Sequence, residues 1–108
     1  MPRGILATST AQLAEDVDTE EIRNCFKKYY ENSTFVAVLE DGSMPMTASV
    51  LGTNNAQIQV AVDTHTNRFV ISCAIDNLGK GAAGQAIQNA NLICGLPMDS
   101  GLQILGVR

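Results

Sequence analysis

Hydrophobic and polar residues alternate with a period of two in several stretches of the chain. The clearest alternation covers residues 56–76, "AQIQVAVDTHTNRFVISCAID", and predicts two strands joined by a turn at "DTHTNR". Residues 4–13 alternate more loosely, with apolar residues on one side, and predict a strand with one buried face. "TFVAVLE" and "TASVLGTN" predict two further short strands, separated by a turn at "DGSMP".

Residues 17–33, "VDTEEIRNCFKKYYENS", carry the signals of an amphipathic helix. Asp18 can cap its first turn, and Glu21 stands three residues later, as in a capping box. The apolar positions recur at helical spacing and form one stripe, made up of Ile22, Cys25, Phe26 and Tyr29. Because ordinary capping and amphipathicity stabilise this helix, we interpret it as scaffold.

A second helix is predicted from about Gly81 to Cys94, with Gly95 as the residue that ends it. Its apolar stripe is built from small residues, so another element can approach it closely. The stripe consists of Ala83, Ala86, Ile87, Ala90 and Cys94. The tail that follows is too apolar for a free terminus and is expected to dock through Leu102, Ile104, Leu105 and Val107.

The start of this second helix is unfavourable for stability. Gly79 and Gly81 each cost roughly 1 kcal/mol in a helix, and Lys80 opposes the helix dipole by up to about 1 kcal/mol. A start with open backbone N–H groups and little side-chain bulk suits an anion or a bulky planar ligand. The alternative is that the glycines permit a tight strand-to-helix turn while Lys80 points into water.

The predicted element order is β-α-β-β-β-β-α, which defines an α+β fold with a mainly antiparallel or mixed sheet and two helices. The 108 residues suffice for a single domain. The strand at 69–75 is apolar or small on both faces, so we expect a helix or a second subunit to cover its other face. A chain that starts directly with a strand suggests a piece of a longer protein.

The composition narrows the classes of function. The formal net charge is -4 and no basic run occurs, which argues against nucleic acid or an anionic membrane surface as a partner. No apolar stretch approaches the length of a membrane span, and the N-terminus lacks the features of a secretory signal. Three widely spaced cysteines favour reduced thiols and a cytoplasmic location. With one histidine and no clustered ligands, we expect no metal site.

Beyond these patterns, the chain contains motifs of a known family. "MPRGILAT" leads into the first strand, "TEEIRNCFKKYYENSTFVAVL" and "GTNNAQI" follow, and "AIDNLGKGAAGQAIQNANLICGLP" covers residues 74–97. These motifs extend over nearly the whole chain, which resembles the C-terminal part of N-acetyl-gamma-glutamyl-phosphate reductase. Aspartate-semialdehyde dehydrogenase is similar more distantly, at "DNLGKGAA".

The resemblance implies an NADPH-dependent reduction of an acyl phosphate to a semialdehyde in arginine biosynthesis, with a cysteine thiolate as nucleophile. It also implies the substrate and dimerisation domain of glyceraldehyde-3-phosphate-dehydrogenase-like enzymes, which pairs into a homo-oligomer. It places Asn77 near the nicotinamide carboxamide and the backbone of Lys80 and Gly81 near the cofactor NADP. Residues 79–108 would pack on a nucleotide-binding domain that precedes this region.

The chain lacks several of the motifs that carry nucleotide binding and catalysis in the family. The glycine-rich nucleotide motif does not occur here, and the nucleophilic cysteine and catalytic histidine have no counterpart. Cys25, Cys73 and Cys94 are expected to be structural, and His65 to be a solvated turn residue. Arg3 could bind a substrate carboxylate or phosphate, or it could form a salt bridge to a neighbouring strand or fray at the terminus. We therefore expect no catalytic residue here and no activity of this chain alone.

Two alternatives to the reductase interpretation stay open. The chain could come from an aspartate-semialdehyde dehydrogenase, which uses another acyl phosphate. It could also be a stand-alone α+β regulatory module that binds a small molecule at its glycine-rich helix start.

Overall fold

The computed structural model describes residues 2–102 and contains one mixed sheet of four strands. The strand order is β1-β4-β3-β2, with β1 (Ile5–Gln12), β2 (Val36–Val38), β3 (Ala56–Asp63) and β4 (Arg68–Ile75). The β1–β4 and β3–β4 pairs are antiparallel, and the β2–β3 pair is parallel. The mixed sheet of an α+β fold and the predicted β3–β4 hairpin are confirmed.

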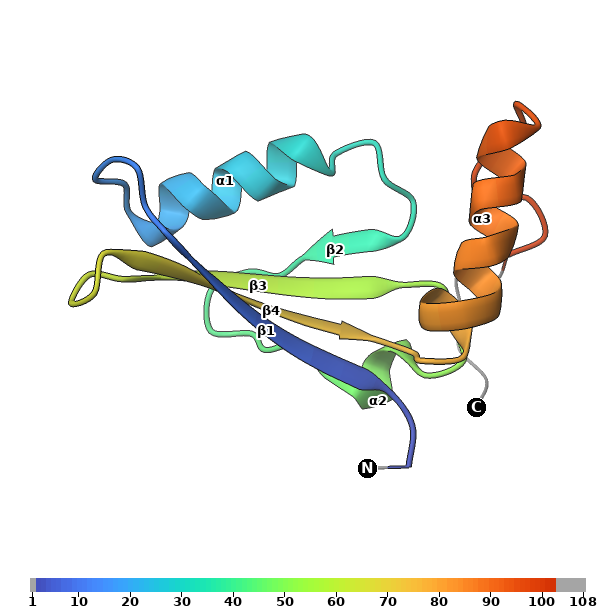
Figure 1. Ribbon diagram of the computed structural model, residues 1–108, viewed down its shortest axis with the longest axis horizontal. Coiled ribbons are helices and arrows are strands. Elements are labelled where there is room, and N and C mark those ends of the chain that lie inside the picture. The colour runs from blue at the N-terminus through green and yellow to red at the C-terminus, as the bar shows by residue number, and fades with distance from the viewer. Residues whose placement is uncertain (1, 103–108) are drawn as a thin grey trace.

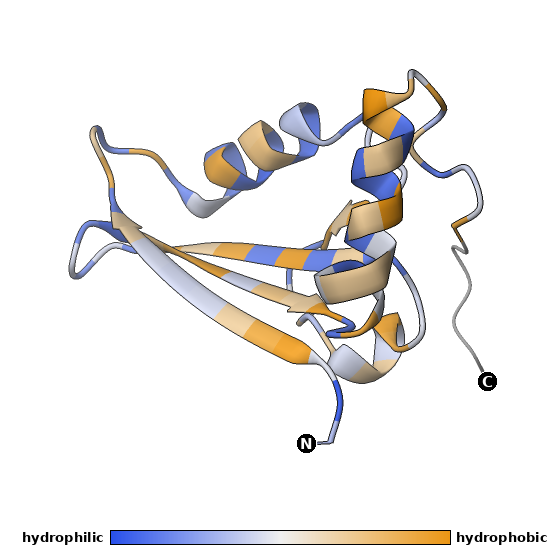
Figure 2. Cartoon of the chain, turned by 45° about the vertical axis from the view of Figure 1, so that its right-hand side comes forward, coloured by the Kyte–Doolittle hydropathy of each residue, from blue (hydrophilic) through white to orange (hydrophobic). Residues whose placement is uncertain are grey.

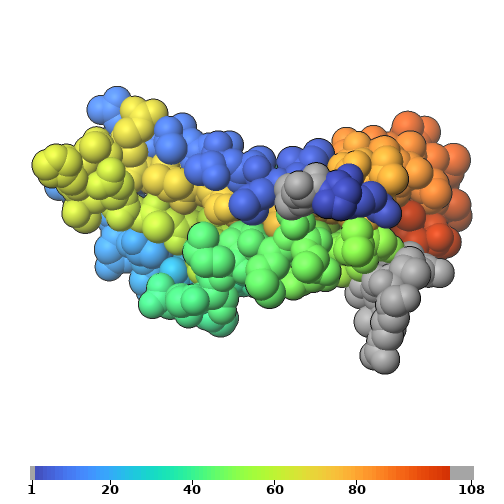
Figure 3. Space-filling model, turned by 90° about the horizontal axis from the view of Figure 1, so that it is seen from below, coloured from blue at the N-terminus to red at the C-terminus, as the bar shows by residue number. Residues whose placement is uncertain are grey.

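Within residues 2–102, three α-helices and one π-helical turn accompany the sheet. They are α1 (Thr19–Tyr29), α2 (Thr47–Val50), the π-helical turn (Gly79–Ala83) and α3 (Gly84–Ile93). Figure 1 shows α1 over one face of the sheet and α3 at the end where β3 begins and β4 ends. Seen from below, β1 and the segment around α2 lie at the surface (Figure 3).

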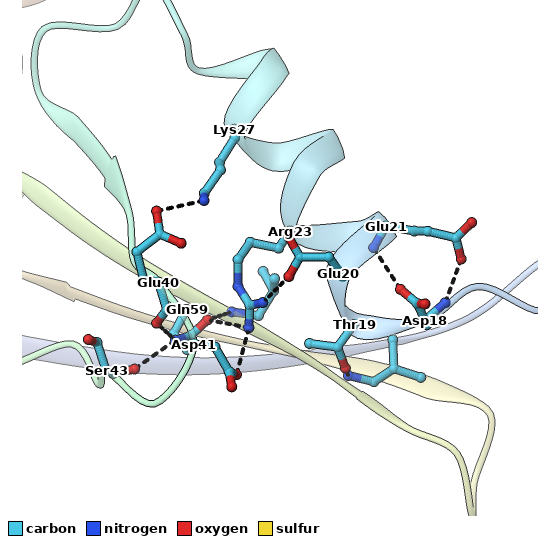
Figure 4. Close-up of polar contacts among 12 residues, drawn as sticks. Asp18, Thr19, Glu20, Glu21, Arg23, Lys27, Glu40, Asp41, Ser43 and Gln59 are labelled. Atoms are coloured by element: carbon cyan, nitrogen blue, oxygen red, sulfur yellow. Dashed lines mark hydrogen bonds and ion pairs between the residues drawn. The ribbon is translucent and has the colours of Figure 1, made fainter.

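The helix α1 carries several polar contacts, and two of them reach the sheet: Arg23 donates to Gln59, and Thr19 accepts from the N–H of Val62 at 2.9 Å. Asp18 and Glu21 form the predicted capping box, with both bonds 2.8 Å long. Arg23 is the buried residue of the helix, and it donates to Glu20 at 2.6 Å and to Asp41 at 3.2 Å (Figure 4). The predicted apolar stripe is therefore only partly directed at the sheet.

The members of that stripe differ in burial. Ile22 and Phe26 are half-buried, whereas Cys25 is exposed and the Tyr29 side chain is 80% exposed. The helix turns its Arg23 face towards β3, where Gln59 is also buried. A buried guanidinium with carboxylate partners on the helix and on the 40s loop explains why periodicity alone misplaced the inward face.

The predicted strand at 47–54 is wrong, because this segment folds into α2 and a turn. The Ser49 N–H donates to the Met46 carbonyl, and the Thr53 N–H donates to the Val50 carbonyl. Gly52 then adopts φ of 72°, a left-handed conformation that glycine accepts readily. The turn buries both Val50 and Thr53. In an extended strand these two side chains would point to opposite faces of the sheet.

The apolar core is small and centres on β3 and its neighbours. It consists of Leu13, Phe35, Val50, Ala56, Ile58, Val60 and Ala74. The prediction that β1 has a buried face is wrong for this chain, because all eight of its residues are exposed. β1 is an edge strand, and among the described helices α1 packs on β3 rather than over β1. On β4, Ala74 is buried and most other residues are half-buried.

The helix α3 stands clear of the sheet and presents its small-residue stripe outwards. All five predicted members of that stripe are exposed, while Gly84 and Asn91 are buried. Figure 2 shows hydrophobic residues recurring along α3 and at the start of β1. Gly95 follows the helix with φ of 69° and ends it, as predicted. Of the tail residues expected to dock, Leu102 is half-buried, and Ile104, Leu105 and Val107 lie outside the described residues.

The glycines at the helix start allow close packing against the loop that precedes β3. A Cβ atom on Gly79 would overlap the carbonyl oxygen of Thr53, and one on Gly84 would overlap the side-chain oxygen of Asn54. The tight contact of these segments therefore requires glycine at both positions. This is a packing reason that the sequence pattern did not show.

We predict that Gly79→Ala lowers the free energy of unfolding by about 3 kcal/mol, because the rigid Thr53 backbone must move to admit a methyl group. Gly42→Ala is the matched control. Gly42 has φ of 78° but open space around it, so only the backbone cost of about 1 kcal/mol should appear. Urea unfolding measures both values. A Gly79→Ala variant that is as stable as the wild type, or more stable, would show that the Thr53 contact contributes nothing.

Candidate functional site

The candidate site lies where β1 begins and β4 ends. The antiparallel register pairs Ile5 with Ile75, so the residues just before β1 meet the residues just after β4. Arg3 and Gly4 thereby lie beside Asp76 and the residue that follows it, although they are separated by 73 positions in the chain. The glycine-rich helix start comes next and completes the site.

Asp76 is the centre of this arrangement. Its side chain is fully buried, and it accepts two bonds from Nη2 of Arg3, at 2.6 and 2.8 Å. Its carboxylate also accepts from the backbone N–H groups of Gly52, Leu78 at 2.8 Å and Gly79 at 3.1 Å. The Arg3 guanidinium and these N–H donors hold the pKa of Asp76 far below its usual range, despite burial. The site is therefore built around a buried, ionised carboxylate.

The side-chain amide of Asn77 has a hydrogen-bond partner for its oxygen but none for its nitrogen among the described residues. Its side-chain oxygen accepts a bond of 2.7 Å from the backbone N–H of Gly4. Among residues 2–102, no partner of its Nδ2 group is found, and the residue is half-buried. Gly4 has φ of 94°, and a Cβ atom there would lie 2.6 Å from Cβ of Thr47. The Nδ2 group of Asn77 is thus an N–H donor without a partner among the described residues.

The side chain of Lys80 turns inwards. Its ammonium donates to the side-chain oxygen of Gln88 at 2.6 Å and lies 5.7 Å from the centre of the Phe35 ring. Burial lowers the pKa of this ammonium. Asn54 donates to the same Gln88 oxygen at 2.9 Å. The alternative that Lys80 points into water is therefore wrong, and its side chain ties the helix start to the domain.

Gly81 is exposed, and its N–H donates to the backbone carbonyl of Asp76 at 2.9 Å. The structure brings Arg3, Asn77, Lys80 and Gly81 together around Asp76. Both bonds of Arg3 to Asp76 run from one nitrogen, and the Arg3 side chain is 41% exposed. The salt-bridge alternative for Arg3 is confirmed. The cofactor and substrate roles of the four residues stay predictions.

The remaining candidate residues lie elsewhere. His65 is exposed in the β3–β4 turn, as predicted, and its backbone N–H donates to the side chain of Asp63 at 3.0 Å. Cys25 and Cys94 are exposed free thiols on or beside helices, and Cys73 is half-buried on β4. Burial raises the pKa of the Cys73 thiol, which is the opposite of activation.

Within residues 2–102, no group of three or more His, Cys, Asp or Glu side chains could hold a metal ion. No helix in the same range is both long and apolar enough to cross a membrane.

Sequence reasoning missed Asp76, which organises the site. A signal was available, because an aspartate between a strand and a helix start is a typical capping residue. It also missed the contacts of Gln88 with Lys80 and Asn54. Those contacts depend on the loop before β3, whose place beside α3 no local pattern indicates.

A four-stranded mixed sheet with a glycine-rich helix start at one end defines an α+β domain. Aspartate semialdehyde dehydrogenase II from Vibrio cholerae has this fold: the TM-score is 0.69 at 20% identity, over 86% of this chain and 28% of that one. A second structure of that enzyme, complexed with ASA, gives a TM-score of 0.68 at 20% identity, over 86% of this chain and 27% of that one.

The family model for the semialdehyde dehydrogenase dimerisation domain matches residues 1–77, and the chain belongs to this family. Curated relatives extend the similarity past residue 77. N-acetyl-gamma-glutamyl-phosphate reductase from Moorella thermoacetica is 48% identical over 105 residues, which is 97% of this chain and 30% of the relative. The protein of the same name from Pelotomaculum thermopropionicum is 52% identical over 100 residues, or 93% of this chain and 29% of the relative.

The enzyme of that name from Streptomyces clavuligerus is 48% identical over 107 residues, or 99% of this chain and 31% of the relative. The resemblance seen in the sequence motifs is thereby confirmed. The chain spans about a third of the length of these curated relatives.

We predict that Asp76→Asn lowers the free energy of unfolding at pH 7 by about 3 kcal/mol or more, because Arg3 and several backbone donors lose a buried anion. The pKa of Asp76 is lowered on folding, so its contribution is fully present above the ordinary carboxyl pKa of about 4. It declines as the pH falls from there towards the lower pKa of the folded state.

Urea unfolding of the two proteins at pH 7, 5 and 3 measures this difference. The gap between them should be the same at pH 7 and 5 and smaller at pH 3. Asp16→Asn, at an exposed aspartate, serves as the control and should change stability by less than about 0.5 kcal/mol. A gap that stays constant down to pH 3 would contradict the ionised, stabilising carboxylate.

Proposed function

We propose that the chain is the C-terminal part of an NADP-dependent N-acetyl-gamma-glutamyl-phosphate reductase, which converts an acyl phosphate to N-acetylglutamate semialdehyde. The observation that carries this proposal is near-complete coverage of the chain by relatives of that name at 48% identity. The activity belongs to arginine biosynthesis. The chain alone is expected to be inactive, because the nucleophilic cysteine and catalytic histidine lie outside it.

The residues of the candidate site fit one end of a nicotinamide cofactor. The open Nδ2 donor of Asn77 can bind a carbonyl oxygen, such as that of the nicotinamide carboxamide. The exposed Gly81 and the backbone of Lys80 leave room beside it, while the Lys80 ammonium stays inside the domain. When bound, the cofactor supplies hydride. The residues of this chain bind and orient its nicotinamide end.

Arg3 keeps only part of its guanidinium available for a substrate. One nitrogen of its guanidinium is committed to Asp76, and only the remaining ones could reach a substrate carboxylate or phosphate. The KM for the semialdehyde in an Arg3→Gln variant separates this role from a purely internal one.

The exposed surfaces fit a domain that works within a larger assembly. The outward stripe of α3 and residues 79–108 would pack on the nucleotide-binding domain, which we propose to precede this region. The exposed β1 strand and its face of the sheet would meet a second copy in a homo-oligomer, in keeping with the description of the family as a dimerisation domain. Free cysteines fit a cytoplasmic protein.

The proposal predicts phosphate-dependent reduction of NADP by the complete protein with N-acetylglutamate semialdehyde, which is the reaction run backwards. The increase of NADPH absorbance measures the rate, and this chain alone is the control that should show none. Activity with aspartate semialdehyde only would move the assignment to aspartate-semialdehyde dehydrogenase. Activity with neither substrate would overturn the proposed function.

We further predict that Asn77→Asp in the complete protein raises the KM for NADP about tenfold. The carboxylate can still accept from Gly4, but it replaces the outward N–H donor with an acceptor and loses about 1.4 kcal/mol of binding. Melting temperature should change little. Asn32→Asp, at an exposed asparagine, is the matched control. A large loss of stability with normal kinetics would make Asn77 a structural residue.

A further inference from the structure

Two pairs of consecutive residues face each other at the candidate site. Arg3 and Gly4 lead into β1, and Asp76 and Asn77 follow β4. Arg3 donates to the side chain of Asp76, and the next residue, Gly4, donates its N–H to the side chain of Asn77 at 2.7 Å. The two contacts lie side by side because the strands are antiparallel and in register at Ile5 and Ile75.

We propose that Arg3 and Asp76 are positioning residues that set the orientation of the Asn77 amide towards the cofactor. This inference rests on the proposed function, in which Asn77 binds the nicotinamide end. It assigns Arg3 to the support of a ligand-binding residue rather than to the substrate.

The orientation follows from hydrogen-bond chemistry. A backbone N–H requires an acceptor, so the side-chain oxygen of Asn77 must face Gly4 and its NH2 group must face the other way. If Gly4 moved away, the amide could rotate and present its oxygen, which would repel a carbonyl. The bond from Gly4 therefore selects the half of the amide that a ligand meets.

Arg3 and Asp76 keep Gly4 in place. Asp76 is fully buried and is held on the domain side by the N–H groups of Gly52, Leu78 and Gly79. Its carboxylate is thus a fixed point, and the guanidinium bound to it fixes the residue directly before Gly4.

The other side of Gly4 is equally confined. A Cβ atom there would lie 2.6 Å from Cβ of Thr47, so the chain passes close to α2 at this point. The backbone before β1 therefore has little freedom as long as the ion pair is intact.

The test uses the complete protein with Arg3→Gln, Asn77→Asp and the double variant, assayed with NADP and N-acetylglutamate semialdehyde. We expect Arg3→Gln to raise the KM for NADP about tenfold while the KM for the semialdehyde stays within twofold of wild type. Arg3→Lys should recover most of the loss, because an ammonium can still pair with Asp76. Arg68→Gln, at an exposed arginine on β4, is the control and should match wild type.

The double variant separates positioning from a general structural effect. If Arg3 acts through Asn77, the double variant should be no worse than Asn77→Asp alone, within about twofold. Losses that multiply would overturn the proposal. A raised KM for the semialdehyde would overturn it in favour of direct substrate binding by Arg3.

Crystal structures of the complete wild-type protein and of Arg3→Gln give a readout that does not need activity. The proposal expects the bond between Gly4 and Asn77 in the wild type and its loss in the variant; a bond that persists unchanged in the variant overturns the proposal. If the wild type reduces NADP with neither semialdehyde, the proposed function fails while this comparison still decides the positioning role. If Arg3→Gln does not fold, the double variant Arg3→Gln/Asp76→Asn replaces it in this comparison. Removing both charges together leaves no buried charge unpaired.

Discussion

The buried carboxylate of Asp76 is the interaction on which the arrangement of the domain depends. It binds Arg3, two residues before β1, and Gly52 in the turn after α2. It also binds Leu78 and Gly79 at the glycine-rich helix start, so it joins segments that are far apart in the chain. A buried carboxylate is tolerated only when hydrogen-bond donors surround its oxygens. If one of these segments moved away, the carboxylate would lose a donor and its contacts with the other segments would weaken. The end of the sheet therefore behaves as one rigid unit.

At the other end of the molecule, Arg23 of α1 and Gln59 of β3 are buried where the helix packs on the sheet, and Nε of Arg23 has no hydrogen-bond partner among the described residues. Gln59 donates to the carbonyl oxygens of Glu40 and Ser43, which pins the loop before α2 (Figure 4). Polar contacts of this kind fix positions more narrowly than apolar packing does, because a displaced partner leaves a buried group unsatisfied. A small apolar core thus coexists with well-defined segment positions, and much apolar surface on β1 and α3 stays outside.

Local signals predicted local structure well. The capping box of Asp18, the alternation of β3 and β4 and the terminating Gly95 each depend on residues within a few positions of one another. The prediction of a strand at 47–54 failed because the segment forms a four-residue helix followed by a turn at the left-handed Gly52. A segment this short contains too few apolar residues to distinguish the period of a strand from that of a helix. The partly exposed stripe of α1 and the exposed stripe of α3 show a further limit: periodicity identifies a helical face but not the partner that covers it.

The glycine-rich segment shows how far the candidate site could be predicted. Resemblance pointed to Asn77, Lys80 and Gly81, and the structure brings them together, but the unfavourable glycines have two separate causes. Gly79 and Gly84 are required by the loop before β3, where a methyl group has no room. Gly81 is exposed, and a Cβ atom there would lie 3.3 Å from the backbone oxygen of Asp76, a much looser contact than the one at Gly79 or Gly84. Packing thus accounts for the flanking glycines, and only the position between them keeps the open, side-chain-free surface that a bound nicotinamide would need.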